Sequence, residues 1–229
     1  MKFLVISDLH ARNEVLDKMD EQFKNADGVL FAGDFAEAFN PESGEEALKL
    51  LCKKHESIFA VLGNCDNEDF LEALEAQDVC VEKTLVFHEG LAFSGAGGGT
   101  FFTGKTEFER SEEEILSDFD IVNNSIEQSG DESLWNSLIL ISHNPPKDTK
   151  CDAVNPELHV GSELFREYIQ KNQPLAVITG HVHEGVAVDY IGDTVVMNPG
   201  SLAEGNYAWL EVEKDGENWK VVNTQLCKL

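Results

Sequence analysis

The 229-residue sequence lacks long apolar runs and paired cysteines. No stretch approaches the roughly eighteen consecutive apolar residues of a membrane-spanning helix. The N-terminal MKFLVI is too short an apolar stretch to indicate a signal peptide. The five cysteines are an odd number and include no CxxC pair, which argues against a disulfide framework or a zinc knuckle. We therefore expect a cytoplasmic protein with reduced thiols.

Basic residues are also scarce. Only 17 Lys and Arg stand against 43 Asp and Glu, which gives a formal net charge of −26. Because a field of this sign repels nucleic acids and anionic lipids, we expect neither a nucleic-acid nor a membrane partner. The chain is long enough to bury one hydrophobic core. We expect a single domain over residues 1–229, and the sequence leaves its oligomeric state open.

Short apolar runs, each typical of a buried strand, recur along the chain. The five that matter most are KFLVISD (2–8), GVLFAGD (28–34), IFAVLGN (58–64), LILISH (138–143) and LAVITGH (175–181). Segments with a helical apolar face follow the first two, at Glu14–Lys24 and Glu45–Lys54. Two hairpins are predicted near the C-terminus, around Gly192-Asp193 and around DGEN (215–218). This alternation predicts an α/β fold.

Potential metal ligands follow each of these five strands. They are Asp8 and His10, Asp34, Asn64, His143, and His181 and His183. An Asp or His at one strand end is more often a turn or cap residue. Open α/β sheets, however, place their sites beyond the carboxyl ends of the strands, so all seven side chains are expected in one crevice. Seven ligands suit two ions that share Asp34 better than one ion with room for substrate.

These motifs resemble the calcineurin-like metallophosphoesterases. The family pattern of DxH, GD, GN, a lone H and GHxH stands here as Asp8-Leu9-His10, Gly33-Asp34, Gly63-Asn64, His143 and Gly180-His181-Val182-His183. The later NPGS at 198–201 is also typical of the family. The resemblance implies a four-layer α/β/β/α sandwich of two mixed sheets. It further implies a hydrolase, either a phosphatase or a phosphodiesterase, that acts on a small phosphoester substrate.

The resemblance also implies ligand sets and catalytic roles. One divalent ion would be held by Asp8, His10, Asp34 and His183, and the other by Asp34, Asn64, His143 and His181. Manganese is expected ahead of iron, nickel and zinc, and a hydroxide bridging the two ions would be the nucleophile. Asp34, Asn64, His143 and Cys65 are the expected catalytic residues. A non-catalytic scaffold with the same fold, binding another protein, is the alternative.

Cys65 stands in GNCD, where the commoner family form is GNHD. That His is thought to assist the leaving oxygen, whereas a neutral thiol is a weak hydrogen-bond donor. We therefore expect little help for the leaving group from Cys65. Asp66 is expected to cap the helix that runs through Phe70 and Leu71.

Residues 99–106 read GTFFTGKT, which matches the phosphate-binding P-loop pattern. A P-loop needs its Lys and Thr in the first turn of a helix, but Ser111 and Glu114 form a capping box that predicts a helix over 111–128. Lys105 and Thr106 then lie in a loop, and ATP binding is the less favoured alternative. We expect a flexible rim loop over Gly95–Thr106 within an insertion at about 95–130. Predicted substrate contacts are Gly97, Gly98 and Asn144.

Overall fold

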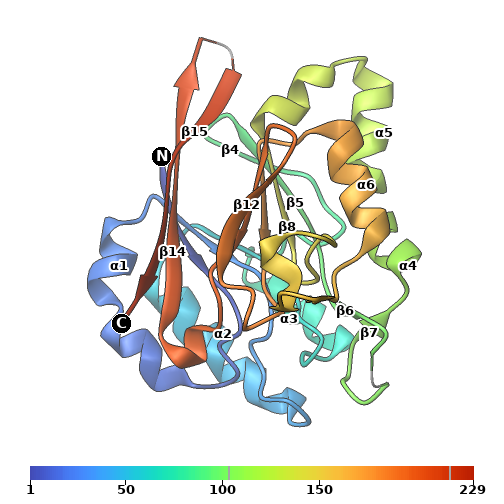
Figure 1. Cartoon of the computed structure of the whole chain (residues 1–229). Helices are drawn as coiled ribbons and strands as arrows, with labels where there is room; N and C mark the ends of the chain where they lie inside the picture. Colours follow the sequence, from blue (N-terminus) through green and yellow to red (C-terminus); the bar gives the residue numbers. More distant parts are fainter. Residues whose placement is uncertain (103, 217) are drawn as a thin grey trace.

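The computed structural model describes residues 1–102, 104–216 and 218–229 (Figure 1). Thr103 of GTFFTGKT and Glu217 of DGEN lie outside the described residues. The strands are β1 (Lys2–Ile6), β2 (Gly28–Phe31), β3 (Ile58–Ala60), β4 (Val86–His88), β5 (Leu91–Ala96), β6 (Gly99–Thr100), β7 (Glu109–Arg110), β8 (Leu138–Ser142), β9 (Ala153–Asn155), β10 (Leu158–His159), β11 (Ala176–Thr179), β12 (Ala187–Ile191), β13 (Thr194–Asn198), β14 (Asn206–Asp215) and β15 (Asn218–Lys228). The α-helices are α1 (Asp20–Asn25), α2 (Gly44–Lys54), α3 (Leu71–Ala76), α4 (Glu112–Ser117), α5 (Asp120–Ser129) and α6 (Glu163–Asn172).

Two large mixed sheets form the centre of the molecule. The first has the strand order β15-β14-β1-β2-β3, with β1, β2 and β3 parallel and β14 antiparallel to β1. The second has the order β12-β13-β11-β8-β5-β4, with β5, β8, β11 and β13 parallel. The parallel strands carry the predicted ligand motifs at their carboxyl ends, so both sheets contribute to the same site.

Strand β1 shows how the layers arise from the sequence. Side chains alternate between the two faces of a strand. Phe3 and Val5 accordingly pack between the two sheets, whereas Leu4 and Ile6 face the cluster that also contains residues of α1, α2 and α3. Burying each of these side chains stabilises the fold by about 1.5–3 kcal/mol. A third cluster joins α4, α5 and α6 to the second sheet. These clusters confirm the predicted four-layer α/β/β/α sandwich.

Most predicted elements are present, with local differences. The helix expected at Glu14–Lys24 is a 3₁₀-helix over Asn13–Lys18 followed by α1. The helix expected over 111–128 is divided into α4 and α5, with the predicted capping box formed by Ser111 and Glu114. Both C-terminal hairpins form. Figure 1 shows the β14–β15 hairpin and the β6–β7 loop projecting from opposite ends of the molecule. Among the described residues, no helix is long and apolar enough to cross a membrane.

Candidate metal centre

The turns after the strands hold four of the seven predicted ligands in unusual backbone conformations. Asp8, His10, Asp34 and His181 have positive φ angles of 56°, 47°, 62° and 66°. Residues other than glycine rarely adopt this left-handed region, and such strain accumulates at functional sites. Hydrogen bonds between the turn after β1 and the turn after β2 hold this backbone conformation in place. Asp8 N donates to Gly33 O at 2.9 Å, and His10 N donates to Asp34 O at 3.0 Å.

Asp8, His10 and His183 form the first group of ligands. One potential ligand atom from each lies within 4.8 Å of the others. His183 Nε2 lies 3.4 Å from Asp8 Oδ1, and the Nε2 atoms of His10 and His183 are 3.2 Å apart. The first strand and the last ligand motif, 173 residues apart, therefore meet at this point.

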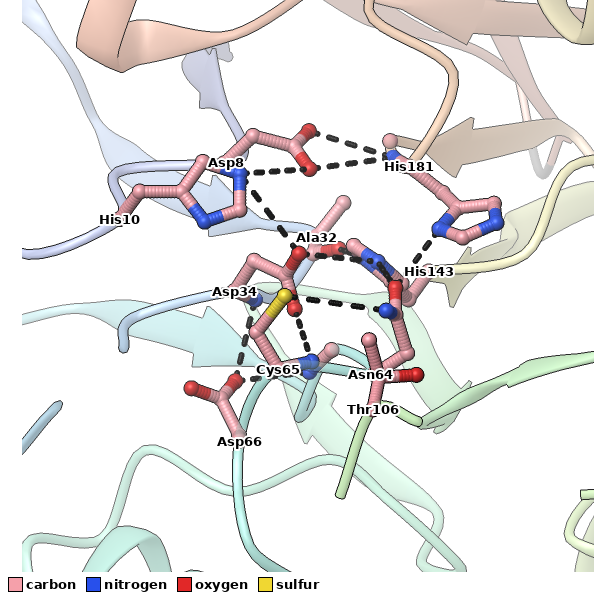
Figure 2. A network of polar contacts seen from close by, with 12 residues as sticks. Asp8, His10, Ala32, Asp34, Asn64, Cys65, Asp66, Thr106, His143 and His181 are labelled. Atoms are coloured by element: carbon pink, nitrogen blue, oxygen red, sulfur yellow. Dashed lines mark hydrogen bonds and ion pairs between the residues drawn. The ribbon is translucent and has the colours of Figure 1, made fainter. Parts of the chain in front are cut away.

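Asn64, His143 and His181 form the second group (Figure 2). The Asn64 Oδ1 atom lies 3.0 Å from His143 Nε2 and 2.7 Å from His181 Nδ1. His143 is fully buried, and Asn64 is almost so. The amide oxygen and two ring nitrogens thus converge on a small volume below the surface.

Asp34 lies between the two groups. Its Oδ2 atom is 3.7 Å from His10 Nε2 and 3.6 Å from His143 Nε2. Its Oδ1 atom accepts a hydrogen bond from Cys65 N at 2.8 Å. The backbone amide therefore fixes the carboxylate with Oδ2 directed between histidines of both groups. The structure brings all seven predicted ligands together.

Backbone carbonyls orient two of the histidines. His10 Nδ1 lies 3.2 Å from Ala36 O, and His143 Nδ1 lies 2.6 Å from Ala32 O. Because a carbonyl only accepts hydrogen bonds, these Nδ1 atoms carry the proton, and in a neutral ring the Nε2 lone pair faces the Asp34 carboxylate. A cation between these groups would be bound by the ring nitrogens and the carboxylate oxygen together. The mixed nitrogen and oxygen donors fit a divalent transition metal.

In the metal-free protein the electrostatics favour a proton on His183 and disfavour one on His181. Asp8 hydrogen-bonds to His183 and raises the pKa of that imidazole to about 9. Burial opposes ionisation of Asp8 itself, but the His183 hydrogen bond and the nearby histidine charges lower its pKa overall. Burial and the charge on His143 lower the pKa of His181 to about 4. A metal ion that binds here must therefore displace a proton from His183.

Asp66 does not cap a helix, so the expectation for this residue was wrong. It lies fully buried, and its carboxylate accepts hydrogen bonds from the backbone N–H groups of Asp34, Phe35, Ala36 and Gly63, at 2.8–3.2 Å. Asn67 is the cap of the short helix that follows. Asp66 therefore joins the Asp34 turn to the Asn64 turn. Its place two residues after Asn64 was the only signal in the sequence, and a cap would occupy the same place.

Cys65 lies within the centre, as predicted. Its Sγ atom and potential ligand atoms of His10 and Asp34 lie within 4.8 Å of one another. Asn64 Nδ2 approaches the sulfur at 3.7 Å. Burial, followed by the Asp34 charge, raises the pKa of the thiol far above its ordinary value. In the metal-free protein the side chain is therefore a neutral thiol.

The three predicted substrate contacts, Gly97, Gly98 and Asn144, lie in buried surroundings. Gly97 and Gly98 are buried, which corrects the expectation of a flexible rim over Gly95–Gly99. Gly98 N donates to Leu62 O at 3.2 Å. Asn144 Oδ1 accepts from Thr100 N and Thr100 Oγ1, at 3.1 and 3.2 Å, and its Nδ2 donates to Pro145 O. The Gly98 amide and the Asn144 side chain thus have hydrogen-bond partners within the protein, and their contact with substrate stays a prediction.

The GTFFTGKT segment does not form a P-loop. Its Lys105 and Thr106 precede α4, which begins at Glu112. The backbone N–H groups of Phe102, Gly104, Lys105 and Thr106 donate to the Glu109 carboxylate. Burial opposes ionisation of Glu109, but these hydrogen bonds outweigh it and lower the pKa to about 2. The amides that resemble a phosphate cradle therefore surround a carboxylate of the same loop.

Comparisons with known proteins identify the family of this chain. The family model for calcineurin-like phosphoesterases matches residues 1–185. The chain is 30% identical over 207 residues to the uncharacterized protein MJ1162 of Methanocaldococcus jannaschii. The aligned region covers 87% of this chain and 88% of the relative.

Solved structures show the same fold. TT1561 of Thermus thermophilus superposes with a TM-score of 0.67 at 16% identity, covering 97% of this chain and 98% of the other. The calcineurin-like phosphoesterase YfkN of Bacillus subtilis superposes with a TM-score of 0.55 at 16% identity, covering 99% of this chain and 89% of the other. By its sequence match and its architecture, this chain belongs to the calcineurin-like phosphoesterase family.

Proposed function

We propose that this protein is a phosphoester hydrolase that uses two divalent metal ions sharing Asp34. The position of Asp34 Oδ2, 3.7 Å from His10 Nε2 and 3.6 Å from His143 Nε2, is the observation that carries this proposal. Asp8, His10 and His183 would complete one ion's ligands. Asn64, His143 and His181 would complete those of the other ion.

The ion pair would make the pocket positive within an acidic protein. Asp8 and Asp34 contribute −2 and two divalent ions contribute +4, so a phosphate group is attracted into the centre despite the net charge of −26. When bound, two such ions lower the pKa of a water molecule and offset charge on the phosphoryl oxygens. A small phosphoester, either a monoester or a diester, is the substrate class we propose. Manganese is the metal we propose first, ahead of iron, nickel and zinc.

Other residues of the chain orient the proposed metal ligands. Ala36 O and Ala32 O hold the rings of His10 and His143 with Nε2 directed at Asp34. Asp66 joins the turns that carry Asp34 and Asn64. Residues that orient ligands in this way commonly change metal affinity or activity about 10–100-fold when they are replaced.

The test begins with chelator-stripped protein reloaded with manganese, iron(II), nickel or zinc. Hydrolysis of p-nitrophenyl phosphate and of bis(p-nitrophenyl) phosphate is then measured, together with the number of ions bound per chain. We expect two ions per chain and hydrolysis of at least one ester. A folded chain that binds fewer than two ions and cleaves neither ester would favour the scaffold alternative and contradict the shared centre.

A further inference from the structure

A buried ion pair connects α4 to the segment beside the metal centre. Arg110 is 9% exposed, and its guanidinium donates to both oxygens of Asp118, at 2.6 and 2.8 Å. The same group donates to Gly97 O at 3.0 Å and to Glu114 O at 2.8 Å. A two-point pair of this kind fixes geometry as well as charge. Arg110 therefore ties the Gly97 carbonyl to the end of α4.

Glu82 holds Gly97 from another side. Glu82 is 1% exposed, and its Oε2 atom accepts a hydrogen bond from Leu62 N at 3.1 Å. A methyl group on Gly97 would overlap this carboxylate. Oε1 of Glu82 has no hydrogen-bond partner among the residues that the structure describes. Gly97 is thus enclosed between the Glu82 carboxylate and the Arg110 guanidinium.

The next residues extend this contact to the second group of ligands. Gly99 N donates to Phe108 O at 3.1 Å, and Phe108 N donates to Asn64 O at 3.0 Å. A Cβ atom placed on Gly99 lies 3.2 Å from Asn64 Cβ and 3.3 Å from His181 Cε1. No hydrogen bond joins residues 97–99 to Asp8, His10 or His183 within the described part of the chain. The segment therefore supports one side of the centre.

We propose that Arg110, Asp118 and Glu82 are positioning residues that press residues 97–99 against Asn64 and His181. They thereby set the affinity for the ion held by Asn64, His143 and His181. This inference rests on the proposed function, because it concerns the second of the two metal positions. It gives the buried charges of the insertion a role in metal binding without contact to substrate.

The first test replaces Asp118 by Asn, which keeps its shape but removes the charge that holds Arg110. Chelator-stripped full-length protein is titrated with Mn²⁺, and free Mn²⁺ is followed by electron paramagnetic resonance. We expect the Mn²⁺ affinity of the site with Asp8, His10 and His183 to stay unchanged. The Mn²⁺ affinity of the site with Asn64, His143 and His181 should fall about tenfold or more. Asp215→Asn is the matched control, since Asp215 pairs with Lys220 at the exposed β14–β15 hairpin, and it should retain both affinities.

The activity of the Asp118→Asn variant adds a second measurement. The Mn²⁺ concentration for half-maximal activity should rise about tenfold, while kcat at saturating Mn²⁺ returns toward that of the wild type. A residue that only stabilised the fold would lower the melting temperature and leave both metal affinities unchanged. That result would overturn the inference.

Gly97→Ala examines the same contact with the ion pair intact. Its methyl group would move residues 97–99 away from Glu82, and it should also weaken only the second site. Wild-type protein that binds two ions, together with variants that bind both with unchanged affinity, would refute the inference alone. Wild-type protein that binds fewer than two ions would instead refute the proposed function.

Discussion

Hydrogen bonds from backbone groups orient several of the candidate ligand side chains in this centre. Ala36 O and Ala32 O orient two imidazoles, and Cys65 N fixes the Asp34 carboxylate. The side chains of Ala32 and Ala36 have no part in metal binding. The side chain of Cys65 is a neutral thiol in the metal-free protein. Replacing a ligand side chain should therefore remove its metal contact while the surrounding turns remain in place.

Asp34→Asn should affect both metal positions, because Asp34 is the residue that the two groups share. The amide has no negative charge to offer two cations. We expect both ions to bind more weakly and kcat/KM to fall on the order of a hundredfold or more, since even an orienting partner contributes about 10–100-fold. Lys105→Ala, in the exposed β6–β7 loop, is the control and should change kcat/KM little. Equal losses in the two variants would contradict the metal assignment.

The buried Cys65 thiol should limit which leaving groups the enzyme handles. Nitrophenolate leaves without a proton, whereas an alkoxide needs one, and a neutral thiol donates weakly. We expect fast hydrolysis of nitrophenyl esters, slow hydrolysis of simple alkyl phosphates and little loss in Cys65→Ser. Single-turnover rates with metal content verified are the measurement. Similar rates for both ester types would refute this expectation, as would an inactive Cys65→Ser variant that retains its metals.

Glu82 should make the metal-free fold less stable as pH rises. Burial raises its pKa to about 7 from an ordinary value of 4.5. Between these values the folded chain keeps a proton that the unfolded chain releases, so the contribution is complete below pH 4.5 and is lost as pH rises through 7. The change is roughly 3 kcal/mol, at about 1.4 kcal/mol per pKa unit.

Urea unfolding of chelator-stripped protein at pH 5 and pH 8 measures this contribution. Glu82→Gln is neutral at both pH values and nearly isosteric with the protonated acid. Its free energy of unfolding should therefore fall less than that of the wild type between the two pH values. Parallel changes in the two proteins would show that Glu82 does not titrate in this range.

Among the elements, the β6–β7 loop shows how a local pattern can serve a different purpose. GTFFTGKT presents several amides to one anion, and the anion is Glu109. Carboxylate and phosphate both attract converging N–H groups, so the sequence pattern alone does not distinguish them. The position of the helix start does, and the capping box at Ser111 made that prediction possible.

Glu109→Ala should loosen this loop without affecting the metal centre. Without the carboxylate, the amides of Phe102, Gly104, Lys105 and Thr106 lose their shared acceptor, and the loop opens more often. We expect faster trypsin cleavage after Lys105, with metal content and melting temperature near those of the wild type. Glu107→Ala changes an exposed neighbour and is the control. Unchanged cleavage of the Glu109→Ala variant would show that the carboxylate does not order the loop.

The elements that the sequence predicted well are those with strong local patterns. The five strands and the convergence of the candidate ligands were predictable, because apolar runs end in side chains able to bind metal and parallel strands bring such ends together. The burial of Gly97 was not predictable, because it depends on Arg110 and Glu82, which meet it only in the folded chain. Asp66 was misassigned for a similar reason, since three of its four backbone partners lie 30 to 32 residues away.

At the scale of the whole molecule, the acidic surface opposes the approach of an anionic substrate. The formal charge of −26 acts at long range, whereas a metal pair would act only within the pocket. Added salt first screens the long-range repulsion between the acidic surface and the substrate, because the Debye length falls from about 30 Å at 0.01 M to about 10 Å at 0.1 M.

We therefore expect kcat/KM for a phosphoester to rise about two- to tenfold between low and moderate ionic strength. The measurement requires constant metal occupancy, checked by metal analysis at each salt concentration. A neutral ester, for which no long-range repulsion exists, provides the comparison if it is hydrolysed. A steep decrease for the anionic ester would show that local positive charge outweighs the field of the surface.

The left-handed backbone of Asp8, His10, Asp34 and His181 has a consequence for how this centre persists. Each such residue costs about 1–3 kcal/mol relative to a relaxed conformation, and glycine would avoid most of that cost. For folding alone, glycine would therefore be the better residue at these four positions, and metal binding, as proposed, would offset the cost. A descendant released from this function should become more stable as it exchanges the four residues for glycine or asparagine. The variant Asp8→Gly, which removes one such residue, should accordingly bind metal less tightly without a comparable loss of melting temperature in the metal-free protein.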